Sequence, residues 1–166
     1  MDVSDSHTYA APLDPVLDMF GDPDAVVARY EGMGHRDVEV LECTRTDDSL
    51  RVRTSRVVEV DLPGFARKVL SPTNTMVQTD EWTASGDGPG DGTVAVDVQG
   101  APVKMSGSMR LEPAGDGTTM HLTLSMSVKV PLVGGRIADW AGKNDVPATM
   151  AAEFAAGDAW LADHSA

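Results

Sequence analysis

The sequence predicts an α+β fold in which a curved antiparallel sheet of about seven strands wraps around a long C-terminal helix. Between residues 35 and 130 apolar and polar residues alternate, and turn-forming residues interrupt them at hairpin spacing. From residue 137 the apolar residues recur mostly every three or four positions, which indicates a helix. This helix is the only predicted element long enough to cover an apolar sheet face. We therefore expect one domain that spans residues 1–166.

The N-terminal part predicts one strand followed by two short helices. Residues 1–10 have the period-two pattern of a strand. A short apolar helix follows, and Gly21 ends it. Asp22 then precedes Pro23, which is the order of an N-cap and the first position of a second helix that ends near Gly32 or Gly34.

Six further strands are expected before the last helix. In the last of them, Met120, Leu122 and Leu124 share the inner face, and His121 lies on the outer face. The glycine-rich segment 86–92 is expected to be a hairpin loop, because it opens no helix and lacks the Lys-Ser/Thr pair of a phosphate-binding loop. The expected strands are 38–43, 50–60, 75–84, 93–99, 105–111 and 119–130.

Two residues, Gly142 and Pro147, weaken the middle of the predicted C-terminal helix. Proline removes a backbone donor and clashes with the carbonyl four residues before it. Either the helix kinks near residues 144–146, or it starts again with Asp145 as its cap. Alanines at 141, 148, 151 and 155 place small side chains along the helix, and aromatic residues are only 5% of the chain. A cavity between sheet and helix is therefore expected.

The charge of the chain argues against several classes of partner. Thirteen basic and 26 acidic residues leave a net charge of −13, which repels nucleic-acid phosphates and an anionic membrane surface. No apolar run approaches the ~20 residues of a membrane span, and the N-terminus lacks the basic and apolar regions of a signal peptide. We expect a cytoplasmic protein that binds no nucleic acid and does not insert into a membrane.

The sequence contains no pattern typical of a metal site or of nucleophilic catalysis. The four histidines lack the spacing of metal ligands, and the lone Cys43 has no partner for an internal disulfide. No serine lies in a nucleophile-elbow motif. No metal, no cofactor and no catalytic residue is therefore predicted.

Polar residues on inward strand faces are the candidates for specific recognition. Arg56 shares a face with Val58, and Asp80 shares one with Trp82. If both faces point into the cavity, Arg56 and Asp80 form a desolvated pair that serves either ligand recognition or unique folding, whereas a β-bulge would turn Arg56 outward. The predicted ligand-binding residues are Val52, Arg56, Val58, Asp80, Trp82, Val96, Met109, Leu122, Leu124, Met126, Ile137 and Phe154.

The C-terminal third carries a resemblance to a known superfamily. The segment 130–135 reads Val-Pro-Leu-Val-Gly-Gly and leads into a helix that ends at Trp160 and Leu161. With the order of elements, it resembles the helix-grip superfamily of START, polyketide-cyclase and Bet v 1-like (SRPBCC) proteins, and more closely an actinobacterial branch of unknown function. The resemblance covers nearly the whole chain. Members of this superfamily bind lipids, sterols, polyketides or plant hormones, and some are cyclases, hydrolases or protein-interaction modules. The resemblance therefore implies one of these functions for this chain.

Three functional hypotheses result. The leading one is a non-catalytic carrier or sensor that holds a small hydrophobic ligand, such as a lipid or polyketide, in the cavity, with Arg56 orienting it. The second is an enzyme of the cyclase or dehydratase type, in which Asp80 or Glu81 moves a proton. The third is a protein-interaction module with a filled core and no ligand. In each case we expect a monomer or a weak homodimer.

Overall fold

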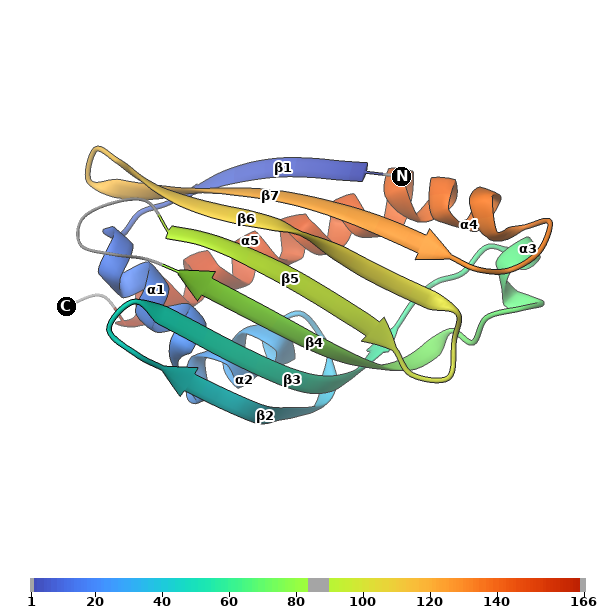
Figure 1. Cartoon of the computed structure of the whole chain (residues 1–166), viewed down its shortest axis with the longest axis horizontal. Coiled ribbons are helices and arrows are strands. Elements are labelled where there is room, and N and C mark those ends of the chain that lie inside the picture. The colour runs from blue at the N-terminus through green and yellow to red at the C-terminus, as the bar shows by residue number, and fades with distance from the viewer. Residues whose placement is uncertain (1, 84–89, 165–166) are drawn as a thin grey trace.

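Seven antiparallel strands form one curved sheet in the computed structural model, which describes residues 2–83 and 90–164. The order across the sheet is β1-β7-β6-β5-β4-β3-β2, so β1 leaves its sequence neighbour and pairs with β7 at the opposite edge (Figure 1). This confirms the predicted sheet. The strands are β1 (Asp2–Tyr9), β2 (Arg36–Arg45), β3 (Ser49–Glu59), β4 (Thr73–Thr83), β5 (Gly90–Val98), β6 (Val103–Ala114) and β7 (Gly117–Val128).

Two short helices follow β1, as predicted: α1 (Leu13–Gly21) and α2 (Pro23–Gly32). The Asp22 side chain caps α2 by accepting a hydrogen bond of 2.9 Å from the Asp24 amide. Both helices lie across the concave side of the sheet, near the strands β2 and β3 (Figure 1). They close one end of the space that the long helix covers.

The glycine-rich segment 86–92 is only partly within the described residues, because residues 84–89 lie outside them. The predicted loop is wrong for its last three residues, since β5 begins at Gly90 and pairs with β6. A side chain at Gly92 would place its Cβ 2.8 Å from the Trp82 ring. Glycine is therefore needed here so that the buried indole can pack against the strand.

The C-terminal helix runs without a break from Gly134 to His164 as α4 (Gly134–Trp140), the π-helical turn η1 (Ala141–Asp145) and α5 (Val146–His164). The predicted restart with Asp145 as a cap is wrong, because the backbone stays helical through Val146. The irregularity expected near residues 144–146 is this π turn. It lies just before Pro147, which has no N–H to donate and whose ring crowds the preceding turn.

The π turn changes which face of α5 points inward. One extra residue in a turn rotates the following helix by about 100° relative to regular α-helical register. Of the small residues expected along the helix, Ala141 is buried, whereas those at 148, 151 and 155 are exposed. The buried side chains of α5 include Val146, Met150 and Phe154.

The aromatic part of the core gathers at the end of the sheet near α1. Phe20 stacks on Trp82 with ring centres 5.5 Å apart, and Tyr9 lies edge-on to both Phe20 and Phe154. A smaller cluster of Leu62, Ala66 and Ile137 joins α3 (Gly64–Arg67) to α4 at the other end (Figure 1). Aliphatic and methionine side chains line the concave face between these two ends.

Candidate functional site

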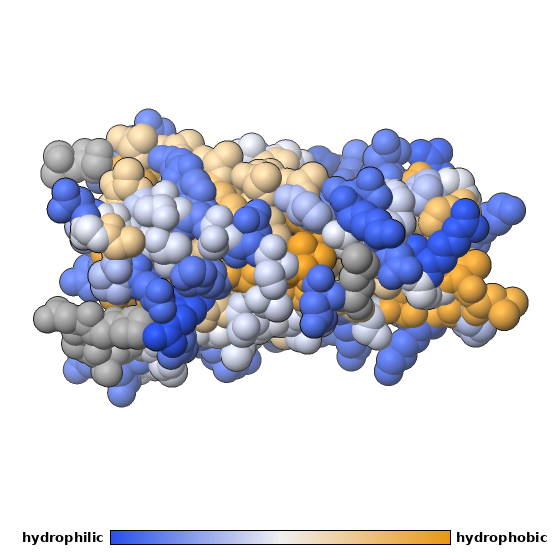
Figure 2. Space-filling model, turned by 90° about the horizontal axis from the view of Figure 1, so that it is seen from above, coloured by the Kyte–Doolittle hydropathy of each residue, from blue (hydrophilic) through white to orange (hydrophobic). Residues whose placement is uncertain are grey.

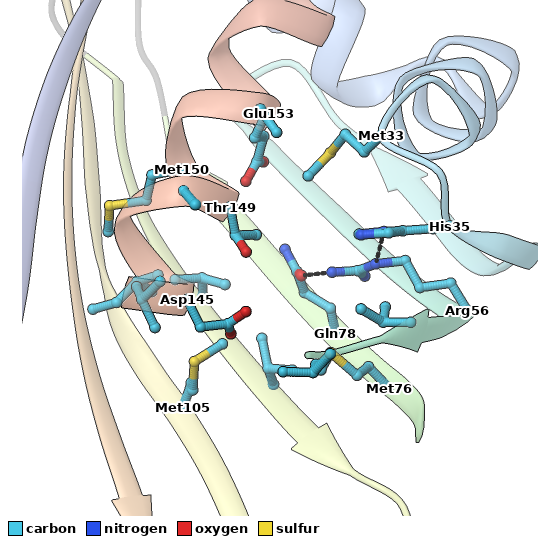
Figure 3. Close-up of a pocket in the computed structure, with 18 of the residues that line it drawn as sticks. Met33, His35, Arg56, Met76, Gln78, Met105, Asp145, Thr149, Met150 and Glu153 are labelled. Atoms are coloured by element: carbon cyan, nitrogen blue, oxygen red, sulfur yellow. Dashed lines mark hydrogen bonds between the residues drawn. The ribbon is translucent and has the colours of Figure 1, made fainter. Parts of the chain in front are cut away.

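A cavity of about 290 Å³, here called the main cavity, lies between α5 and the inner face of the sheet (Figure 3). Exposed lining residues at Gly34, Ala148 and Ala152 mark its rim. Six of the nine methionines line it, and their flexible side chains can adapt to different shapes. The apolar lining residues are Val58, Val60, Met76, Val94, Val96, Met105, Met109, Met120, Leu122, Leu124, Val146 and Met150, with Met33 at the α2–β2 connection.

Arg56 brings a buried positive charge to one side of the main cavity. It is only 6% exposed, and the regular pairing of β3 with β4 points it inward, so no bulge turns it outward. Its Nε donates to Nδ1 of His35 at 3.1 Å, and its Nη2 donates to Oε1 of Gln78 at 2.8 Å (Figure 3). The guanidinium carbon lies 3.9 Å from the ring centre of Tyr30, which adds a cation–π contact.

Asp80 balances this charge without touching it. The direct pair predicted between Arg56 and Asp80 does not form, because Gln78 lies between the two side chains. The Gln78 Nε2 donates to the Asp80 carboxylate at 2.9 and 3.2 Å. Strand register explains the separation, since Arg56 lies opposite Met76 and Asp80 lies opposite Val52.

A second arginine is buried near Arg56, and the guanidinium groups of both contact the ring of Tyr30. Arg29 of α2 is 4% exposed, and its Nη1 is 3.9 Å from Oε1 of Glu153, a lining residue on α5. Its guanidinium packs near the rings of Phe20 and Tyr30, at 4.9 and 5.6 Å. The Arg29 Nε finds no hydrogen-bond acceptor within the described residues. On this side of the site, Arg29 thus pairs with Glu153, and Arg56 is linked to Asp80 through Gln78.

Burial shifts the ionisation of three groups around the cavity. It raises the pKa of Asp80 to about 6, although the Gln78 hydrogen bond opposes the rise. Burial and the charge of Arg56 lower the pKa of His35 to about 4. At neutral pH His35 is uncharged, and because its Nδ1 accepts from Arg56, its proton lies on Nε2. Burial also raises the pKa of Asp145, which lines the cavity from the π turn.

A smaller cavity of about 60 Å³ lies beneath α4, next to the main one. The two cavities share Val60, Met76 and Asp145 as lining residues. The walls of the smaller one are almost wholly apolar, and they include Leu70 and Ile137. The two cavities therefore adjoin, and the smaller one lies toward the α3–α4 end of the molecule.

The predicted ligand-binding residues divide among three places. Arg56, Val58, Val96, Met109, Leu122 and Leu124 line the main cavity, and Met126 and Ile137 line the smaller one. Val52, Asp80, Trp82 and Phe154 line neither. The core near α1, where Phe20 and Tyr9 fill the space, contains Val52, Trp82 and Phe154. The Asp80 carboxylate contacts Gln78, which lines the cavity. The contact of these four residues with a ligand stays a prediction.

Several residues that line the main cavity were not predicted from the sequence. Glu153 and Thr149 share a helix face with Val146 and Met150, but the π turn hides this register in the sequence. His35 lies in the α2–β2 connection, where no periodicity places a side chain. Gly34, with a φ of 87°, gives this connection the left-handed turn that brings His35 to Arg56.

Other candidate chemistries can be placed on the structure. Glu81, one of the two proposed proton-transfer residues, is exposed and pairs with Arg51 on the outer face of the sheet. Across residues 2–83 and 90–164, no three His, Cys, Asp or Glu side chains gather as a metal site would require. Among the helices described, none has the length and apolar character needed to cross a membrane.

Comparison with known proteins gives a family and a fold. Residues 4–161 match the family model described as a protein of unknown function, DUF2505. No curated protein matches the chain. Among solved structures, TTHA0849 from Thermus thermophilus is 16% identical with a TM-score of 0.68, over 99% of this chain and 100% of that one.

Two further structures extend the fold comparison. Norcoclaurine synthase from Thalictrum flavum is 11% identical with a TM-score of 0.56, over 99% of this chain and 87% of that one. Human STARD10 is 9% identical with a TM-score of 0.60, over 98% and 66%. At such identities the likeness shows the fold alone, and it is the helix-grip fold of START, polyketide-cyclase and Bet v 1-like proteins.

Proposed function

We propose that this chain, which belongs to the DUF2505 family of proteins of unknown function, binds a small and mainly apolar molecule in the main cavity as a carrier or sensor. The observation that carries the proposal is the cavity itself, a mainly apolar space of about 290 Å³ with polar groups from the sheet, such as Arg56, and from the C-terminal helix, such as Thr149. Small-molecule sites have volumes of about 300–1,000 Å³, and they too are lined mainly by apolar side chains with a few polar groups. The ligand is therefore compact, with one polar end.

The polar end of the ligand accepts hydrogen bonds. Arg56 has five N–H donors, of which three bond to His35, Thr54 and Gln78, so two stay available. Thr149 adds a hydroxyl on the opposite wall (Figure 3). A carbonyl, hydroxyl or carboxylate oxygen directed at Arg56 satisfies these donors, while the methionine-rich wall holds the apolar part, as in a lipid or polyketide.

Native mass spectrometry of the protein purified from its own host tests this proposal first. A reproducible extra mass that organic extraction removes supports a bound molecule and gives its mass. Refilling the extracted protein with the recovered molecule then tests the location. Met109→Trp and Leu124→Trp fill the cavity, so we expect both to reduce uptake about tenfold or more.

Leu41→Trp is the matched control, because Leu41 is exposed on β2 and lies outside the cavity. Each variant must keep a cooperative thermal transition. Uptake by Met109→Trp and Leu124→Trp equal to that of the control would place the ligand elsewhere. Arg56→Leu tests the polar end separately, by a loss of affinity for the recovered molecule but not for an apolar analogue.

An enzymatic function is the second candidate, and Asp145 is the observation that favours it. This carboxyl lies in a π turn, lines both cavities, and has a pKa raised by burial. Such turns recur at functional sites, and a raised carboxyl pKa suits proton transfer near neutrality. If the wild type converts the recovered molecule to a product and Asp145→Asn does not, the protein is an enzyme rather than a carrier.

We also propose that the chain forms a single domain over residues 1–166, is a monomer or weak homodimer, lies in the cytoplasm, and is similar to an actinobacterial branch of the superfamily. Absence of nucleic-acid binding belongs with these proposals, and the net charge of −13 supports it.

A further inference from the structure

The end of the molecule formed by α3 and the β7–α4 connection exposes apolar side chains, and we call it the tip. It comprises residues 60–72 between β3 and β4, and residues 129–140 from the end of β7 to the end of α4. The two segments pack together through Leu62, Ala66 and Ile137. Leu132 is fully exposed and Val69 is 44% exposed, and hydrophobic residues gather at this end of the surface (Figure 2).

Leu132 is held in an unusual backbone conformation. Its φ is 73°, in the left-handed region that leucine adopts only at a cost. No packing within the described residues offsets this cost, since the side chain is wholly exposed. A strained and projecting leucine suggests a contact outside the chain.

The charge of the tip differs from that of the rest of the protein. Its two segments hold four basic and two acidic residues, whereas the remaining chain holds nine basic and 24 acidic ones. Lys68, Lys129 and Arg136 form no ion pair with any described residue. Arg136 instead lies 3.9 Å from the ring centre of Phe65, which holds the guanidinium at the tip surface. Salt screens charges beyond about 8 Å, so the acidic body does not cancel this local field.

The smaller cavity lies directly behind the tip. Leu70 and Ile137 take part in the tip cluster and also line this cavity, which adjoins the main one. The tip thus supplies both exposed apolar side chains and part of the wall of the smaller cavity.

We propose that the tip docks on the surface of a bilayer that contains anionic lipids. Leu132 enters the interfacial layer, and Lys68, Lys129 and Arg136 contact lipid phosphates, as in other peripheral anchors. The inference goes beyond the ligand proposal and does not depend on it. A second copy is a poorer occupant, because two tips that each hold four basic and two acidic residues repel each other at close range. A projecting side chain also suits a deformable lipid layer better than a rigid protein face.

Co-sedimentation with lipid vesicles tests the proposal on the whole chain. We expect binding to vesicles of phosphatidylcholine with phosphatidylglycerol at about 0.15 M salt, where the charge of the acidic body is screened, and little binding to phosphatidylcholine alone or at about 1 M salt. Leu132→Asn removes the apolar contact and should weaken binding about tenfold. Asparagine tolerates the left-handed conformation, so this variant keeps the fold. Lys129→Glu should weaken binding by a similar factor through charge reversal.

Two substitutions away from the tip are the matched controls. Leu41→Asn removes the other large exposed leucine, on β2, and Arg53→Glu reverses an exposed charge on β3. Both should bind vesicles as the wild type does. No binding by the wild type, or equal losses in tip and control variants, would overturn the proposal. So would a concentration-dependent dimer in ultracentrifugation that Leu132→Asn abolishes, because the tip would then join two copies.

Discussion

Arg56 donates a hydrogen bond of 2.8 Å to Gln78, and this contact connects the positive charge of the cavity wall to Asp80. Gln78 uses its oxygen toward Arg56 and its nitrogen toward Asp80, so both ends of the amide are engaged. A neutral side chain thus couples two charges that the register of β3 and β4 keeps apart. Any residue that lacks either end of the amide leaves one partner unsatisfied.

Gln78→Leu should lower the free energy of unfolding by about 2–3 kcal/mol, because it removes one hydrogen-bond acceptor of the buried Arg56 and the amide donor to the Asp80 carboxylate. Urea denaturation at neutral pH measures the change. Gln99→Leu is the control, since Gln99 is exposed after β5, and its effect should stay within about 0.5 kcal/mol. Equal effects of the two substitutions would mean that the Gln78 bridge contributes nothing to stability.

The pH dependence of stability should depend on two opposing groups. The pKa of Asp80 rises from 3.8 to about 6 on folding, so the folded state binds more protons in this window and stability falls as pH rises through it. His35 does the reverse, because folding lowers its pKa from 6.5 to about 4 and stability rises with pH. The two contributions therefore oppose each other in the wild type, whose profile between these values should be flatter than that of a variant that lacks one of the two groups.

Replacing one of these two groups should reveal how the other makes the free energy of unfolding depend on pH. In His35→Asn, stability should fall from pH 4 to pH 6 by up to about 3 kcal/mol, the value of a shift of about two pKa units. In Asp80→Asn, stability should rise with pH, by a smaller amount because His35 is only half-buried. Urea midpoints across this range give both slopes. Asp116→Asn, in the exposed β6–β7 turn, should leave the wild-type profile unchanged.

Gly157→Ala should destabilise the protein by about 1–2 kcal/mol although alanine is the better helix former. A Cβ at this position would lie 2.8 Å from Cε1 of Tyr9, whose ring is buried where α5 crosses β1. Gly32→Ala at the end of α2 is the control, because nothing lies within 4 Å of its Cβ position. The melting temperatures of the two variants, measured by thermal unfolding, give the comparison. A higher melting temperature for Gly157→Ala would show that helix and sheet can separate without loss.

Leu132→Asn should raise the free energy of unfolding by up to about 1 kcal/mol, because asparagine adopts a positive φ more readily than leucine. The same substitution at Leu41 should lower it, since asparagine is a poor strand former. Chemical denaturation of both variants checks the opposite signs. A loss of stability in Leu132→Asn would indicate that the leucine packs within the chain.

The sequence by itself determined the architecture of this protein. Alternation such as that from Met120 to Val128 depends on a repeat of two residues and needs no distant partner, so it predicted both the strand and its inner face. The Asp22-Pro23 cap is equally local, and the order of elements left few ways to cover the sheet. The position of the cavity wall on β3 to β7 follows from these local signals.

The tertiary structure decided where along that wall the cavity lies and which groups meet in it. Val52 and Trp82 share their stripes with cavity residues, but Phe20 and Tyr9 arrive from distant segments and fill that end. Strand register placed Gln78 between Arg56 and Asp80. The π turn before Pro147 rotated α5 and brought Glu153 inward. Register and rotation depend on contacts between segments far apart in the chain, and no local pattern encodes them.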